Sequence, residues 1–181
     1  MSPQMSPQLS PPISAQSSES VATATAADLP VATRQYCTFW AGGLYFGIDV
    51  RSVQEVLRYQ LMSSVPRAAK AVSGLINLRG QIVTAIDLRH RLDLPVSSPE
   101  DQLLNVIVSS RNEVVSLLVD DIGDVIDTGD ATIEPTPATL PAHLRDVIEG
   151  VLALPDEILL VLGADLAADV TLTNRTPGGR S

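Results

Sequence analysis

Few side chains in this chain of 181 residues are of the types that carry out nucleophilic, acid–base or metal chemistry. The two histidines, His90 and His143, have no Cys or second His at the spacing of a metal site. The one cysteine, Cys37, falls inside an expected strand, where a thiol is usually a small buried hydrophobe. Neither a Gly-x-Ser-x-Gly motif nor a phosphate-binding glycine loop occurs. The sequence therefore predicts no catalytic residue, no metal ligand and no cofactor.

One acidic segment, residues 120–130, could suggest a calcium site. It lacks the Asp-x-Asp-x-Asp-Gly register and the closing bidentate Glu of a helix–loop–helix calcium site. Ile122, Val125 and Ile126 alternate with the acids in a way that fits a strand whose carboxylates face water. We expect this segment to be a structural or partner-facing surface.

Arg79 is the charged residue that most needs an explanation. With Gly80 it forms the tip of a predicted hairpin at residues 74–88, between two apolar, β-branched runs. Gly80 supplies the positive φ of a tight turn. In one interpretation, Arg79 is a turn residue whose head lies in water. In the other, it forms a bidentate bridge to Glu55 that fixes two strands and leaves donors free for a partner. The sequence leaves both interpretations open.

Composition limits the class of protein. Apolar residues make up 45% of the chain and aromatic residues only 3%, which predicts an aliphatic core. The net charge of −9 argues against a nucleic-acid partner, because phosphate contacts need clustered Lys and Arg. A single cysteine excludes an internal disulfide, and no apolar run approaches the ~20 residues that cross a bilayer. With no secretory signal at the N-terminus, the expectation is a soluble cytoplasmic protein.

Charge is unevenly distributed along the chain. Residues 35–99 carry seven basic and four acidic side chains, a net +3, whereas residues 100–170 carry two basic and fifteen acidic ones, a net −13. This asymmetry indicates two halves that face different partners or each other. The alternative is that the acidic half is simply a well-solvated surface.

Three segments differ in composition. Residues 1–34 are Ser, Pro, Gln, Ala and Thr with few large apolar side chains, which predicts a disordered tail. Residues 171–181 are also polar and predict a second disordered tail. The folded unit is then expected at residues 35–170.

Short apolar runs bounded by Gly, Pro or polar clusters predict strands throughout this unit. They lie at residues 36–40, 44–48, 74–88 (as a hairpin), 103–108, 113–119, 122–126, 150–154 and 158–162. Residues 50–57 have the apolar spacing of a helix, but they equally fit a strand that follows one helical turn. Helical turns are expected at residues 67–72, 88–92, 142–148 and 164–168, and a proline-rich loop at 134–141. In the turn at 88–92, Arg89, His90 and Arg91 are expected to face solvent.

The two halves of the folded unit are weakly similar to each other. Residues 53–56 match 122–125, the hairpin after Gly74 matches the hairpin after Gly150, and residues 87–88 match 165–166. Two similar small β-units follow from this. Many short strands favour barrels over a sandwich, because closure removes exposed strand edges.

Taken together, these segments resemble a known family. The motifs are Val53-Gln54-Glu55-Val56, then Val65-Pro66, then Gly-Leu-Ile-Asn-Leu-Arg-Gly-Gln-Ile-Val at 74–83, then Ile86-Asp87-Leu88. Residues 117–122, the Ile-Glu-Pro-x-Pro loop at 133–137 and the Gly150 hairpin continue the pattern. In this order they are similar to the CheW-like coupling proteins of bacterial chemotaxis, over about residues 36–168.

The resemblance implies a mainly β fold with two five-stranded SH3/OB-like barrels, side by side, with short helices and a groove between them. The two barrels would be interleaved and correspond roughly to the first and second halves of the folded unit. The implied function is a non-catalytic adaptor that couples the cytoplasmic helical tip of a methyl-accepting chemoreceptor to the regulatory domain of a CheA-type histidine kinase. We expect a protein that is monomeric when isolated, lies at receptor arrays on the inner face of the membrane, does not insert into it, and binds no nucleic acid.

The resemblance also implies two sets of binding residues. Receptor contact would involve the first barrel and the groove, which would accept an amphipathic helix: Val53, Glu55, Val56, Gly74, Arg79 and Gly80. Kinase contact would involve the second barrel and its proline-rich loop: Ile122, Asp124, Pro135, Pro137 and Thr139.

Two other functions remain open from the sequence. One is an adaptor of the same family in a chemosensory pathway with another output, such as surface motility or gene regulation. The other, from a different class, is a small-ligand-binding β-barrel protein, which would need a closed apolar pocket with convergent polar groups.

Overall fold

The computed structural model describes residues 34–170, apart from residues 97–98, 112 and 130. Except for Arg34, the two predicted tails at residues 1–34 and 171–181 lie outside the described residues.

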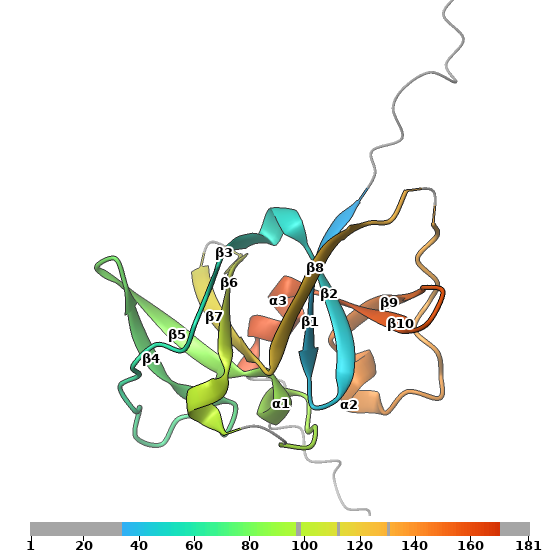
Figure 1. The fold of residues 1–181 in the computed structure, drawn as a ribbon. Helices are drawn as coiled ribbons and strands as arrows, with labels where there is room; N and C mark the ends of the chain where they lie inside the picture. The colour runs from blue at the N-terminus through green and yellow to red at the C-terminus, as the bar shows by residue number, and fades with distance from the viewer. Residues whose placement is uncertain (1–33, 97–98, 112, 130, 171–181) are drawn as a thin grey trace, which may run out of the picture. The chain divides into compact units, whose positions relative to one another are not determined.

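Strands from both ends of the described chain form one five-stranded sheet, the terminal sheet, in the order β8-β1-β2-β10-β9. Its strands are β1 (Gln35–Ala41), β2 (Leu44–Asp49), β8 (Asp121–Asp127), β9 (Ile148–Ala153) and β10 (Ile158–Leu162). The middle of the chain forms the central sheet, in the order β3-β6-β7-β5-β4. Its strands are β3 (Val53–Leu57), β4 (Val72–Leu78), β5 (Gln81–Asp87), β6 (Leu104–Ser110) and β7 (Glu113–Val119). Figure 1 shows these two groups of strands.

Within the described part of the chain, three short helices connect or follow the strands. They are α1 (Leu88–Arg91), α2 (Ala142–Arg145) and α3 (Ala164–Ala168), with single 3₁₀ turns at Val50–Ser52 and Glu100–Gln102. The Asp87 carboxylate begins α1, because its Oδ1 accepts hydrogen bonds from the backbone N–H of Arg89 and of His90.

The mainly β prediction with two five-stranded units is confirmed, but the division into a first and a second half is wrong. The terminal sheet needs both chain ends, because β2 pairs in parallel with β10, with Phe46 opposite Leu160. The strand that begins the predicted second half, β6, instead pairs with β3 and β7 in the central sheet.

The internal similarity seen in the sequence corresponds to equivalent places in the two sheets. Counted from one edge, β8 and β3 are the first strands, and β9 and β4 are the last. Both sheets have the same directions of pairing: two antiparallel pairs, one parallel pair and one antiparallel pair. The helices α1 and α3 follow the equivalent strands β5 and β10.

Each sheet also closes on itself in the same way. After β3 the chain returns to the other edge of the central sheet, where Ser63 and Leu75 exchange two backbone hydrogen bonds of 2.9 Å. After β8, Glu134 and Val151 exchange two such bonds across the terminal sheet, of 2.8 and 2.9 Å. A glycine precedes Leu75 and Val151 in each case. A Cβ atom at Gly74 would lie 2.7 Å from the Ser63 carbonyl oxygen, and one at Gly150 would lie 2.7 Å from the Glu134 carbonyl oxygen. A glycine at these two positions lets the backbones approach and pairs strand edges that would otherwise be exposed.

Among the described residues, the core consists of three apolar clusters. The largest draws side chains from both sheets, including Phe39 and Phe46 of the terminal sheet and Val106 and Leu117 of the central sheet. The two smaller clusters each belong to one sheet: Ile107 is in that of the central sheet, and Leu159 in that of the terminal sheet. Successive side chains along a strand thus point alternately to the small cluster of that sheet and to the large cluster shared by both sheets.

Several predicted turns differ in detail. Residues 50–57 form one 3₁₀ turn followed by a strand, which confirms the second of the two interpretations. The predicted helix at 67–72 is wrong: Arg67 has φ of 62°, outside the right-handed helical region, and β4 already begins at Val72. The helix predicted at 142–148 is shorter than expected: it ends at Arg145, and the buried Ile148 is already the first residue of β9.

Candidate functional site: two docking surfaces

The structure pairs Arg79 with Glu55. Arg79 Nη2 lies 2.8 Å from Glu55 Oε2, and the Arg79 side chain is 80% exposed whereas that of Glu55 is 21% exposed. The contact with Glu55 of the second interpretation is present, as a single contact where a bidentate one was expected, and most of the Arg79 side chain also lies in water, as in the first interpretation. Most of the Arg79 side chain thus remains in water, with donors on Nε and Nη1 that Glu55 does not use.

The local fold explains why Arg79 reaches Glu55. Arg79 and Gly80 have φ of 53° and 90°, so both central residues of the β4–β5 turn are left-handed, as in a type I′ hairpin. The Asn77 side chain accepts a hydrogen bond of 2.8 Å from the Gly80 N–H and steadies this turn. The sequence indicated a positive φ for Gly80 but not for Arg79, which is unusual for a non-glycine residue.

The six predicted receptor-binding residues all lie in the central sheet. Glu55 and Val56 are on the edge strand β3, and the tip of the β4–β5 hairpin carries Arg79. Val56 is 40% exposed, and Val53 is half-buried against the shared core. Gly74 is buried beneath the Ser63 backbone, so it acts through the shape of the strand edge and offers no side chain. These residues come from the two opposite edges of one closed sheet.

The five predicted kinase-binding residues belong to the terminal sheet and the loop that follows β8. Ile122 packs against the shared core, whereas Asp124 is exposed on the edge strand β8. The exposed side chains of Pro135, Pro137 and Thr139 lie on the loop between β8 and α2. The two sets of predicted binding residues are therefore separated, one on each sheet.

Residues 121–127 of the acidic segment form the strand β8, where a strand was predicted at 122–126. Asp121, Asp124 and Asp127 face solvent, as expected, and Val125 is also 55% exposed. Within the described residues, no group of three or more His, Cys, Asp or Glu side chains could hold a metal ion.

Two arginines that were predicted to face solvent are buried, and this prediction is wrong. Arg89 is 1% exposed and Arg91 is 4% exposed, while His90 is half-buried. Arg89 Nη2 lies 2.7 Å from Asp87 Oδ2, and Nη1 lies 3.1 Å from Asp120 Oδ1. The Asp-Leu-Arg order after a strand was the available signal, because the Asp87 carboxylate that caps α1 also accepts hydrogen bonds from the side chain of Arg89, two residues later.

Electrostatics explain how these charges remain buried. Burial alone would raise the pKa of Asp87, but the hydrogen bonds and charge of Arg89, helped by His90, outweigh it and hold the pKa below its usual value. The hydrogen bond from Arg89 to Asp87 raises the pKa of Arg89, and burial only partly opposes this. Burial lowers the pKa of Arg91, against the charges of Asp169 and Asp146.

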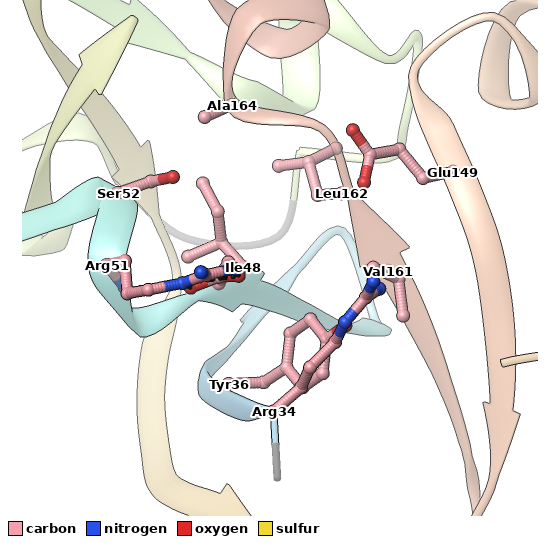
Figure 2. Close-up of a pocket in the computed structure, with 10 residues that line it drawn as sticks. Arg34, Tyr36, Ile48, Arg51, Ser52, Glu149, Val161, Leu162 and Ala164 are labelled. Carbon is pink, nitrogen blue, oxygen red and sulfur yellow. Dashed lines mark hydrogen bonds and ion pairs between the residues drawn. The ribbon is translucent and has the colours of Figure 1, made fainter. Parts of the chain in front are cut away.

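A hollow of about 290 Å³ lies at one end of the terminal sheet (Figure 2). Its lining includes four charged side chains: Arg34, Asp49, Arg51 and Glu149. Arg51 Nη2 lies 2.6 Å from Asp49 Oδ2, and the hydrogen bond from Arg51 lowers the pKa of Asp49. This ion-paired polar lining differs from the closed apolar pocket that a small-ligand-binding barrel would need.

None of the helices among the described residues is long and apolar enough to span a membrane.

Comparison with known proteins agrees with this architecture. A model of the CheW-like domain family matches residues 35–169. The chain is 28% identical over 132 residues to the chemotaxis protein CheW of Rhizobium meliloti (strain 1021), covering 73% of this chain and 85% of that protein. It is 30% identical over 131 residues to the chemotaxis protein CheW of Bacillus subtilis (strain 168), covering 72% and 84%.

A solved structure has the same fold. The crystal structure of the scaffolding protein TtCheW from Thermoanaerobacter tengcongensis superposes with a TM-score of 0.68 at 24% identity, covering 76% of this chain and 93% of that one. The family match spans nearly all of the described residues, including both sheets and the Arg79 hairpin. The chain thus belongs to the CheW-like domain family, and these relatives support a scaffold role in chemotaxis signalling.

Proposed function

We propose that this protein couples the cytoplasmic helical tip of a chemoreceptor to the regulatory domain of a CheA-type histidine kinase, at receptor arrays on the inner face of the membrane. The observation that carries the proposal is the Glu55–Arg79 pair, which holds the Arg79 side chain, 80% exposed, at the edge of the central sheet. An exposed pair of this kind contributes only about 0–1 kcal/mol to stability, so recognition is the better reason for it.

The receptor tip binds the central sheet in this proposal. Val53 and Val56 supply apolar contacts, and Arg79 at the tip of the β4–β5 hairpin supplies hydrogen-bond donors. This combination suits an amphipathic helix with an acidic or amide-bearing flank. The test is binding of the receptor tip to wild-type protein and to Arg79→Ala, measured by calorimetry. We expect a clear loss of affinity with an unchanged fold.

The chain provides a matched control for this substitution. Arg111 is also an exposed arginine with positive φ at a hairpin tip of the central sheet, between β6 and β7, and it lies 3.8 Å from Asp165. Arg111→Ala should bind the receptor tip like wild type. Equal binding by wild type, Arg79→Ala and Arg111→Ala would refute the role proposed for Arg79.

The kinase binds the terminal sheet in this proposal, near β8 and the loop that contains Pro135 and Pro137. Residues 34–52 and 120–170, which build this part, carry three Lys or Arg and thirteen Asp or Glu, a net −10. The central part, residues 53–119, carries seven Lys or Arg and six Asp or Glu, a net +1. The charge asymmetry therefore follows the two sheets, which supports a basic partner surface on the terminal side.

Salt dependence tests the kinase interaction. Charges at the rim of an interface are screened by added salt, so kinase affinity should fall as ionic strength rises. Asp124→Asn should weaken the interaction and reduce its salt dependence. Kinase binding that is insensitive to salt would contradict the proposed basic partner surface.

A further inference from the structure

The short helix α1 carries two buried arginines that both reach from the central to the terminal part of the molecule. Arg89 and Arg91 belong to a four-residue helix that directly follows the central strand β5. Long cationic side chains are rarely buried unless they are paired. Their partners therefore show what the helix is connected to.

Among the described residues, Arg89 joins the end of β5, the link between β7 and β8, and the turn between β1 and β2. Its Nε and Nη2 donate to the two carboxylate oxygens of Asp87, at 3.1 and 2.7 Å. Its Nη1 donates to Asp120 Oδ1 at 3.1 Å, while Asp120 Oδ2 accepts a 2.7 Å hydrogen bond from the backbone N–H of Gly42. The Asp120 backbone N–H donates in turn to Trp40 O at 2.9 Å. The guanidinium thus links the end of β5 to the turn between β1 and β2 of the terminal sheet.

Arg91 makes a second link. Its Nη2 donates to Leu166 O at 2.9 Å, so α1 is connected to α3, the helix that follows β10. Its Nε is buried and has no hydrogen-bond partner among the described residues. A buried charged group with an unpaired donor lowers stability, which suggests that the Arg91 link is kept for its geometry.

The shared apolar cluster already holds the two sheets together, so these arginines must add something else. Burial of apolar surface is non-directional and permits small slides or rotations of one sheet against the other. Charged hydrogen bonds with a planar guanidinium are directional and permit one arrangement. Buried ion pairs often contribute little net stability but can specify one geometry.

We propose that α1 is the joint that fixes the angle between the two sheets, with Arg89 as the positioning residue. The consequence rests on the proposed function: a receptor-binding surface on one sheet and a kinase-binding surface on the other would be held at one fixed angle. A scaffold whose angle varies still binds each partner alone, but it joins both in the required geometry only part of the time.

The first arm of the test measures the angle without any partner. Residual dipolar couplings of backbone amides should fit one alignment tensor for both sheets in the wild-type protein. In Asp120→Asn the two sheets should require separate tensors, because the ion pair to Arg89 is lost. Asp120→Glu, which keeps the carboxylate, should restore the single tensor. Arg111→Ala removes an exposed 3.8 Å ion pair across the same junction and should leave it unchanged.

The second arm measures binding. For Asp120→Asn we expect unchanged affinity for the receptor tip alone and for the kinase domain alone, but a loss of about tenfold in assembly of the three-component complex, within the usual range of coupling between sites. If Asp120→Asn does not fold, Arg89→Lys replaces it, because Lys keeps the charge without the planar fork.

The outcomes separate the joint from the proposed function. A single tensor for both sheets in Asp120→Asn or Arg89→Lys would overturn the joint. Equal losses in the two-component and three-component assays would overturn Arg89 as a positioning residue for coupling. Failure of the wild-type protein to bind either partner would overturn the proposed function, while the dipolar couplings would still decide on the joint.

Discussion

Removal of the Arg89 guanidinium should destabilise the protein by an amount that depends strongly on pH. In Arg89→Leu the Asp87 carboxylate, which is 1% exposed, loses the cation that donates two hydrogen bonds to it. Breaking a buried ion pair by removing one partner costs about 3–5 kcal/mol. In the folded variant the backbone N–H groups at positions 89 and 90 still donate to Asp87, so we expect the loss in the free energy of unfolding to be at the lower end of this range, about 3 kcal/mol at neutral pH.

The sign of the pH dependence follows from the Asp87 pKa. In wild type this pKa is lowered, so the pair contributes stability above the unfolded pKa of about 3.9, and this stability is lost as pH falls through the folded pKa. In Arg89→Leu the hydrogen bonds and charge of Arg89 no longer oppose burial, and only the smaller contribution of His90, whose Nδ1 lies 3.0 Å from Asp87 Oδ2, remains. The folded pKa of Asp87 should therefore rise above the unfolded one. The variant then gains stability as pH falls towards about 4, because its folded form binds the proton more tightly.

Urea unfolding followed by Trp40 fluorescence measures both effects. Trp40 is the one tryptophan, and its ring stacks on Tyr45 at a centroid distance of 4.6 Å, so unfolding changes its surroundings. The difference in the free energy of unfolding between wild type and Arg89→Leu should be largest near neutral pH and should become smaller on acidification. Arg111→Leu, at an exposed pair, should differ by less than about 1 kcal/mol at each pH. A difference for Arg89→Leu that is equally small, or that does not change with pH, would refute this reasoning.

Three further predictions concern single sites. Arg79→Ala should change the free energy of unfolding by no more than about 1 kcal/mol, measured in urea, because the pair with Glu55 is exposed; a larger loss would make the pair structural. Gly74→Ala should lower stability by about 1–3 kcal/mol and speed amide exchange at Leu75, because the new Cβ would lie 2.7 Å from the Ser63 oxygen; wild-type exchange would argue against a close approach. Burial raises the pKa of the Cys37 thiol, so a thiol reagent should modify it slowly in the native protein and rapidly in urea, and rapid native labelling would contradict its burial.

Local patterns in the sequence were sufficient for most strands and for the Glu55–Arg79 pair. Glycine pairs, β-branched runs and turn residues act over a few positions, so β1, β2, β4 and β5 could be located closely. Glu55 could be named because it is the one acid between Arg51 and Arg79. The single contact between them could not be predicted, because it depends on the left-handed conformation of Arg79 itself.

Contacts between distant segments were beyond these patterns. Arg89 and Arg91 look like the polar face of a surface helix until Asp120 and the Leu166 carbonyl, far along the chain, are brought to them. The choice of β10 as the neighbour of β2 has the same origin, since an apolar strand does not specify its partner. The weak internal similarity was the best guide, because it matched strands at equivalent places in the two sheets.

The interleaved order of strands has a consequence for biosynthesis. All five strands of the central sheet are contiguous in the chain, so they can pair as soon as β7 has left the ribosome. The hairpin of β1 and β2 is synthesised first, but β2 can pair with its second neighbour only after β10 has been made. The pairing of Leu160 in β10 with Phe46 in β2 closes one of the longest loops in the fold. During that interval the apolar face of β1 and β2 has only part of its final cover, so the nascent chain is most prone to aggregation between the synthesis of β2 and that of β10.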